Sequence, residues 1–150
     1  MYEELLDPPC WELRGRPKVS VFLSALFDLF GKDCALVLEY SDVKPSVANI
    51  LSAISDRTGE SETVVNIETW SGLRYEIQLG RPIPQPLVEL CEHHAAPEYC
   101  SHAFVFRSGV PVLLWFDFGG EQIIIRPEID ESVIRTLAER TGLTYRKSEK

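Results

Sequence analysis

The stretch 101-SHAFVFRSGVPVLLWFDFGGEQIIIR-126 decides the fold class. Two short turns, Ser108-Gly109 and Gly119-Gly120, divide it into three runs rich in Val, Ile, Leu, Phe and Trp. Such runs, separated by two-residue turns, predict a three-stranded antiparallel meander. The rest of the chain is predicted to cover this meander. We therefore expect one α+β domain over residues 1–150, a mostly antiparallel sheet packed with about four helices.

The turns of the meander also predict its register. With two-residue turns, Phe106 pairs with Pro111, Phe104 with Leu113, and Phe116 with Ile123. This register gives one apolar face, predicted to pack against helices, which holds Val105, Val112, Leu114, Phe116, Phe118, Ile123 and Ile125. The other face is mixed and holds His102, Phe104, Phe106, Leu113, Trp115, Asp117, Gln122, Ile124 and Arg126.

Periodic apolar residues predict four helices around the meander. The first follows Pro17 and ends at Gly31, with one apolar stripe from Val19 to Phe30. The others are predicted from near Pro45 to Gly59, from about Pro86 to Ala95, and from the N-cap Asp130 to Thr141, before Gly142. Cys34 to Tyr40 is predicted as a buried strand.

Three further segments complete the expected domain. Ser61 to Leu79 is predicted to form a hairpin that turns at Ser71-Gly72, and a β-α-β unit is the alternative. Residues 1–16 are expected to be irregular, and residues 143–150 to be a frayed tail.

The charge of the chain limits its partners. A formal net charge of -8 disfavours nucleic acid and anionic membranes as direct ligands. The longest apolar run, VPVLLWF, is far shorter than the roughly 18 residues of a membrane span, and the N-terminus has acids and prolines where a signal peptide needs bases. We therefore expect a cytoplasmic protein.

Acidic residues concentrate in one part of the sequence. Between Asp33 and Glu76, eight carboxylates face only Lys44, Arg57 and Arg74. One interpretation is a solvated surface, and the other is an acidic patch that meets a basic protein partner.

The segment CEHHAAPEYCSH, Cys91 to His102, carries the residue types that ligate zinc: all three histidines, two cysteines and two glutamates. The candidate ligands are Cys91, His94, Cys100 and His102. The segment has no C-x2-C or H-E-x-x-H spacing, so ordinary packing is the favoured interpretation. No cofactor is predicted, with zinc as the alternative. A thiol nucleophile, Cys91 or Cys100 beside His94 or His102, is the enzymatic version of the same cluster.

The mixed face of the meander supplies the candidate binding residues. Aromatic and arginine side chains are common interface anchors. The favoured interpretation is that a further helix covers Phe104, Phe106 and Trp115, while His102, Asp117 and Arg126 reach the rim. The alternative is a recognition surface or shallow pocket formed by Trp115, His102, Asp117 and Arg126. A homodimer through this face is as compatible with the sequence as a monomer.

Three functions follow, in order of preference. In size, acidity and mixed α and β character the chain is similar to bacterial immunity proteins that neutralise toxins. The charge asymmetry, together with the absence of a G-x-S-x-G, P-loop or G-x-G-x-x-G motif, favours a non-enzymatic protein-interaction module such as an immunity or accessory factor. The second hypothesis is a metal-dependent or thiol enzyme that uses the Cys91–His102 cluster. The third is a small-ligand-binding or sensor domain that uses the Trp115 face.

Overall fold

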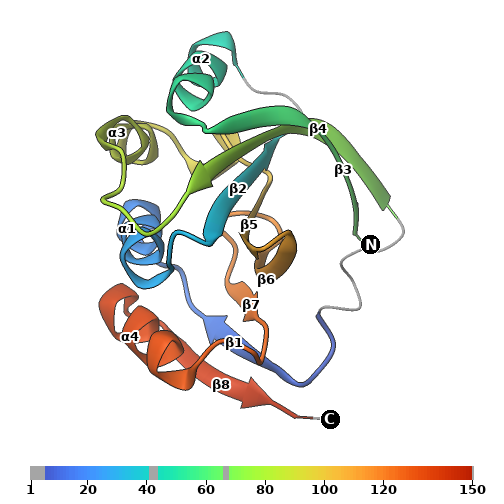
Figure 1. Cartoon of the computed structure of the whole chain (residues 1–150), viewed down its shortest axis with the longest axis vertical. Coiled ribbons are helices and arrows are strands. Elements are labelled where there is room, and N and C mark those ends of the chain that lie inside the picture. The colour runs from blue at the N-terminus through green and yellow to red at the C-terminus, as the bar shows by residue number, and fades with distance from the viewer. Residues whose placement is uncertain (1–5, 41–43, 66–67, 150) are drawn as a thin grey trace.

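The computed structural model describes residues 6–40, 44–65 and 68–149, except for the side chains of residues 40, 60–65 and 68–71. In this part of the chain, eight strands form one antiparallel sheet and four α-helices pack on one of its faces (Figure 1). The predicted α+β fold is confirmed. Within the same described residues, no helix has the length and apolar character needed to cross a membrane.

The sheet has the strand order β3-β4-β2-β5-β6-β7-β1-β8. The strands are β1 (Cys10–Arg14), β2 (Cys34–Tyr40), β3 (Arg57–Val65), β4 (Glu68–Gln78), β5 (His102–Arg107), β6 (Val110–Trp115), β7 (Gln122–Ile125) and β8 (Thr144–Ser148). The helices are α1 (Val19–Leu29), α2 (Pro45–Ile54), α3 (Gln85–His93) and α4 (Glu131–Thr141), and a short 3-10 turn, η2, spans Ala96–Glu98.

The helix ends follow the local sequence signals. Pro45 lies at the first turn of α2, where its missing N–H costs nothing. Asp130 is the N-cap residue of α4, although its side chain makes no capping hydrogen bond. Gly142 ends α4 with φ 71, a left-handed conformation that glycine adopts without strain.

The main core lies between the helices and the face of the sheet that they cover. Phe22, Phe27 and Leu26 of α1 are buried against Leu36 of β2 and Trp115 of β6. Burial of these large apolar side chains is the main source of stability for the fold.

The opposite face of the sheet, called the second face below, has a smaller apolar cluster of its own. It comprises the buried residues Cys10, Val37, Phe104, Phe106, Leu114 and Ile124, with Leu6 and Phe116 packed against them. The helices contribute no side chain to this cluster among the described residues.

The meander is formed by β5, β6 and β7, but its predicted register is only partly right. Phe106 pairs with Pro111 as predicted, and an irregularity between Val105 and Phe106 then shifts the register, so that Phe104 pairs with Leu114. A bulge changes the alternation of side chains between the two faces. The predicted faces of β6 are therefore wrong from this point: Leu113 and Trp115 lie in the main core, and Leu114 and Phe116 lie on the second face.

The connection between β6 and β7 is also longer than predicted. Leu114 pairs with Ile124, so Gly119-Gly120 is part of a loop over residues 116–121. Trp115 is fixed beside this loop because its indole Nε1 donates a hydrogen bond of 3.2 Å to the carbonyl oxygen of Gly120.

β3 and β4 form the predicted antiparallel hairpin, and the alternative β-α-β unit is not formed by these described strands. The pairing of the two strands extends to Val65 and Glu68, and residues 66 and 67 lie outside the described residues. The predicted turn at Ser71-Gly72 is wrong, because these residues lie in β4 and pair with Glu62 and Ser61.

A strand forms near each end of the described chain, which corrects the prediction of an irregular segment over residues 10–14 and of a frayed tail over residues 144–148. β1 lies between β7 and β8, and Cys10 pairs with Ser148. The sequence TYRKS gives β8 a mostly exposed, charged character that is typical of an edge strand.

Candidate functional site

The four predicted metal ligands have separate partners in the structure. The Nδ1 atom of His94 lies 3.2 Å from Oε2 of Glu98. The Cys100 thiol is buried and donates a hydrogen bond of 3.0 Å to the backbone oxygen of His102, whereas Cys91 lies beside the Tyr99 side chain. Across the described residues there is no group of three or more His, Cys, Asp or Glu side chains that could hold a metal ion.

The thiols of this segment are held in the protonated form. Burial raises the pKa of Cys91 to about 11, and the neighbouring Glu92 adds to this effect. Burial also raises the pKa of Cys100. A thiolate is the nucleophilic form of cysteine, so neither environment activates the thiol at neutral pH.

The structure brings together two of the four predicted binding residues. The backbone N–H of Asp117 donates a hydrogen bond of 3.1 Å to Nδ1 of His102, which lies on the second face. Trp115 is fully buried on the other side of the sheet, against the rings of Phe22 and Phe118, at centroid distances of 5.0 and 4.6 Å. The fourth residue, Arg126, donates through Nη1 to the backbone oxygen of Asp7, at 3.3 Å.

A hollow with an apolar floor opens beside Asp117 on the second face. We call it the Asp117 hollow, and its volume is about 280 Å³. Leu6, Leu114, Phe116 and Ile124 form its apolar part, and its polar lining consists of Asp117, Glu121, Gln122 and the backbone of Gly120. Asp117 has a positive φ of 51, in the left-handed region that few residues other than glycine adopt.

The charged side chains that line this hollow, Asp117 and Glu121, are both carboxylates. Asp117 is exposed and makes no ion pair with any described residue. Glu121 pairs with Arg16 at 3.0 Å, but both side chains are largely exposed, at 66% and 76%, so water and salt screen this pair. The chemistry of the hollow suits a group with an apolar body and a positive end.

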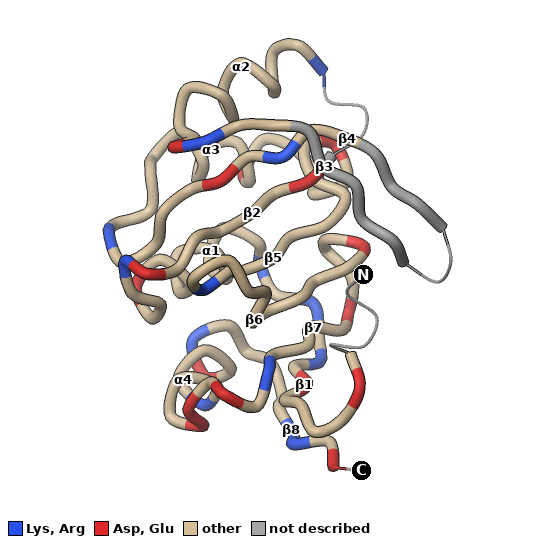
Figure 2. Tube along the Cα trace, turned by 45° about the vertical axis from the view of Figure 1, so that its right-hand side comes forward, with Lys and Arg blue, Asp and Glu red and all other residues tan. Residues whose placement is uncertain are grey.

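Four of the eight carboxylates between Asp33 and Glu76, namely Asp42 and the side chains of Glu60, Glu62 and Glu68, lie outside the described residues, so the acidic patch stays a prediction. Figure 2 shows cationic and acidic residues interspersed along the trace. Each of three carboxylates in the stretch has a cationic partner: Asp33 with Arg107 at 3.6 Å, Asp56 with Arg81 at 2.9 Å, and Glu76 with Arg74 at 2.9 Å.

Two further hollows were not predicted from the sequence. One, of about 560 Å³, lies on the second face beside Arg74 and is called the Arg74 cleft. The signal that could have found it is the alternation of Arg74, Glu76 and Gln78 with Tyr75 and Ile77, which places three polar side chains on one face of β4.

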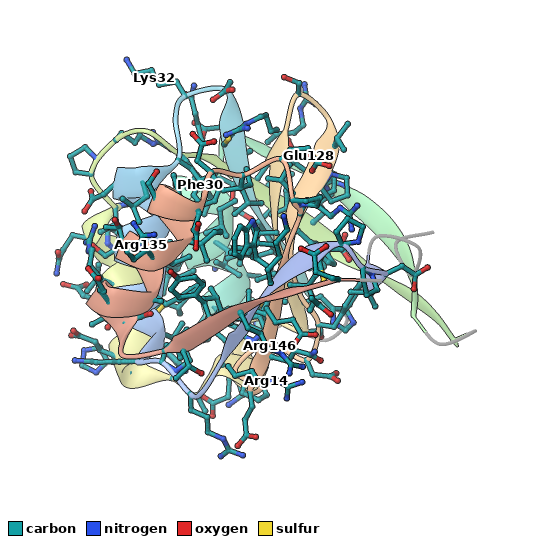
Figure 3. The ribbon with its side chains drawn as sticks, turned by 90° about the horizontal axis from the view of Figure 1, so that it is seen from below. Arg14, Phe30, Lys32, Glu128, Arg135 and Arg146 are labelled. Atoms are coloured by element: carbon teal, nitrogen blue, oxygen red, sulfur yellow. The ribbon has the colours of Figure 1, made fainter. Side chains whose placement is uncertain are left out.

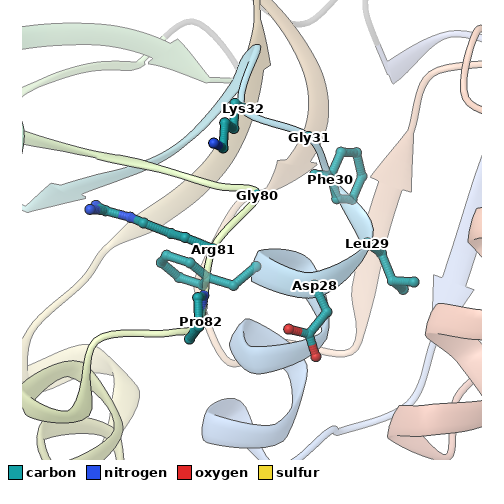
Figure 4. A pocket seen from close by; sticks show the side chains of 9 residues that line it. Asp28, Leu29, Phe30, Gly31, Lys32, Gly80, Arg81 and Pro82 are labelled. Atoms are coloured by element: carbon teal, nitrogen blue, oxygen red, sulfur yellow. The ribbon is translucent and has the colours of Figure 1, made fainter.

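The other hollow, of about 430 Å³, lies where the C-terminal end of α1 meets the connection between β4 and α3 (Figure 4). The Gly80 N–H donates to the backbone oxygen of Phe27 at 3.1 Å, which holds the two segments together. At this hollow Asp28 is paired with Arg140, and Arg81 with Asp56, each at 2.9 Å. These charges are thus already partnered.

Comparisons of the chain with protein-family models, with curated proteins and with solved structures return no match.

Proposed function

We propose that the chain is a non-enzymatic protein-binding module that accepts a basic side chain of a partner protein in the Asp117 hollow. One observation carries this proposal: an apolar floor lies directly beside a carboxylate that has no cationic partner in the described chain. An immunity or accessory protein is the type of module that this role suggests.

The occupant follows from the chemistry of the lining. Lysine and arginine bury their methylene groups on apolar surface and keep the charged end outside. The half-buried Leu6 and Phe116 offer that surface, and Asp117 offers the charge at the rim. The net charge of -8 would also speed the approach of a basic partner.

The enzymatic alternative has no comparable support. Burial keeps Cys91 and Cys100 protonated, and His94 is engaged with Glu98. A metal-dependent or thiol enzyme remains a prediction for which the described contacts supply no activating group.

The test uses the full chain labelled with 15N and two probes, N-acetyl-arginine methylamide and its neutral analogue N-acetyl-norleucine methylamide. We expect the arginine probe to shift the backbone signals of Phe116, Asp117 and Gln122, with a dissociation constant of about 1–10 mM. The neutral probe should bind at least about fivefold more weakly, because it has no charge for the carboxylate.

Two matched variants locate the effect. Asp117→Asn keeps the shape and the left-handed backbone conformation, which asparagine tolerates, but removes the charge. It should weaken the arginine probe by about fivefold or more. Glu139→Gln removes a charge from an exposed position of α4 and should leave binding unchanged. Equal binding by the two probes, or equal loss in the two variants, would contradict the proposal.

A further inference from the structure

The Arg74 cleft contains an arginine that is held in place with part of its hydrogen-bonding capacity unused. The guanidinium carbon of Arg74 lies 4.6 Å from the centroid of the Phe106 ring. Its Nε donates a hydrogen bond of 2.9 Å to Oε1 of Glu76. Ring and carboxylate together fix the plane of the guanidinium.

The two terminal nitrogens of this guanidinium, Nη1 and Nη2, have no hydrogen-bond partner in the described structure. The side chain of Arg74 is only 23% exposed, so it is less hydrated than a surface arginine. The Nη pair forms a planar fork that matches the two oxygens of a carboxylate or phosphate.

Two more cations line the same cleft. Lys32 and Arg57 are exposed, and neither forms an ion pair with another described residue. The acidic residues of the lining are already used, because Asp33 pairs with Arg107 and Glu76 with Arg74. The unpaired charge in the cleft is therefore positive, although the whole chain is acidic.

The cleft also has an apolar part and a size that suits a small molecule. Ala35, Val37 and Phe106 lie along its floor. Its volume of about 560 Å³ falls within the range of about 300–1,000 Å³ that is typical of small-molecule sites.

We propose that the Arg74 cleft binds a small organic anion through its carboxylate or phosphate group. The Nη atoms of Arg74 hold two oxygens of that group, Lys32 and Arg57 supply further positive charge, and the body of the ligand lies on the apolar floor. This inference does not depend on the protein-binding role, because the Asp117 hollow and the Arg74 cleft share no lining residue.

The test uses the full chain labelled with 15N, titrated separately with inorganic pyrophosphate and with succinate at constant ionic strength. Binding should shift the side-chain Nε–Hε signal of Arg74 and the backbone signal of Arg57, with a dissociation constant below about 1 mM for at least one probe. The probe that binds more tightly tells whether the anionic group is a phosphate or a carboxylate.

Arg74→Lys keeps the positive charge but loses the planar fork and the contact with the ring, so we expect at least about tenfold weaker binding. The matched control is Arg146→Lys, the same exchange on β8. Arg146 pairs with Glu12 at 2.8 Å, and it is far from Lys32 in the view of Figure 3. The control should change binding by less than about twofold.

Thermal unfolding of each variant shows whether it is folded. If Arg74→Lys does not fold, Arg57→Ala, an exposed change in the same cleft, should weaken binding by about threefold or more. The proposal is overturned if neither probe shifts the Arg74 signal at about 20 mM. It is also overturned if Arg146→Lys weakens binding as much as the cleft variant does. Neither result bears on the arginine probe of the Asp117 hollow.

Discussion

The backbone N–H of Asp117 donates a hydrogen bond to Nδ1 of His102 across 15 positions of the sequence. Because Nδ1 accepts this bond, it carries no proton, and the neutral ring holds its proton on Nε2. The bond connects the loop that lines the Asp117 hollow to a buried histidine of β5. A proton on Nδ1 removes the acceptor of this bond, so the hold on the loop depends on the protonation of the His102 ring.

This connection predicts a pH dependence of stability. Burial lowers the pKa of His102 below its ordinary value of 6.5, and the nearby Asp117 and Glu39 oppose this effect. The unfolded chain therefore binds the proton at a higher pH than the folded chain. The free energy of unfolding should fall as the pH drops below 6.5 toward the folded-state pKa.

Urea unfolding at several pH values between 7 and 5 measures this effect. His102→Gln should show a shallower fall than the unchanged protein. His93→Gln, at an exposed position of α3, should behave like the unchanged protein. An unaltered slope in His102→Gln would refute the assignment.

Gly80 and Gly109 have similar backbone conformations, but only Gly80 lies close to the backbone of another segment. Both have a positive φ, 75 and 80, so alanine is strained at either position. A Cβ atom at Gly80 would lie 2.6 Å from the backbone nitrogen of Lys32, whereas one at Gly109 would meet nothing within 4 Å (Figure 4). Gly109→Ala should cost about 1–2 kcal/mol and Gly80→Ala about 2–4 kcal/mol, measured by urea unfolding. Equal costs would show that the two segments can move apart.

Trp115 is predicted to be a stability residue. Trp115→Ala removes a fully buried ring and its hydrogen bond to Gly120, so we expect a loss of about 3–5 kcal/mol in the free energy of unfolding. Val110→Ala, at the start of the same strand and 56% exposed, should cost less than about 0.5 kcal/mol. A stable, well-folded Trp115→Ala protein would contradict the placement of this ring in the main core.

The thiol of Cys91 should react slowly in the folded protein. Its pKa of about 11 leaves little thiolate at pH 7.5, and it is half-buried on α3. Alkylation with iodoacetamide, followed by mass spectrometry of the peptides, should be at least about tenfold slower in the folded than in the guanidinium-unfolded chain. Alkylation of folded Cys91 as fast as in the unfolded chain would revive the thiol-enzyme hypothesis.

The elements with strong local signals could be predicted from the sequence. Cys34 to Tyr40 is a strand, and Gly142 ends the last helix, because continuous apolar runs and left-handed glycines act over a few residues. The strands β1 and β8 lack such signals. These two strands form because they pair with each other, although they lie far apart in the sequence. The local pattern of residues carries no information on such a distant partner.

The candidate site shows the same limit at finer scale. The sequence predicts that His102 and Asp117 lie together, and they do make contact, but it predicts the wrong face for Trp115. A single irregularity between Val105 and Phe106 exchanged the faces of β6. A bulge depends on how three strands fit together, and it leaves no separate mark in the residue pattern.

The position of β1 has a consequence for how the chain acquires its structure. Arg146 and Glu12, paired across β1 and β8, are 134 positions apart in the sequence. A nascent chain that grows by about 5–20 residues per second would carry β1 without either neighbour for roughly 10 s. The helices α1, α2 and α3 can form during that time, but the sheet is not complete until β7 and β8 are synthesised. Pairing between strands so far apart in the sequence is typical of slowly folding proteins. A chain that is released before β7 and β8 are made exposes unpaired strand edges, which favour aggregation.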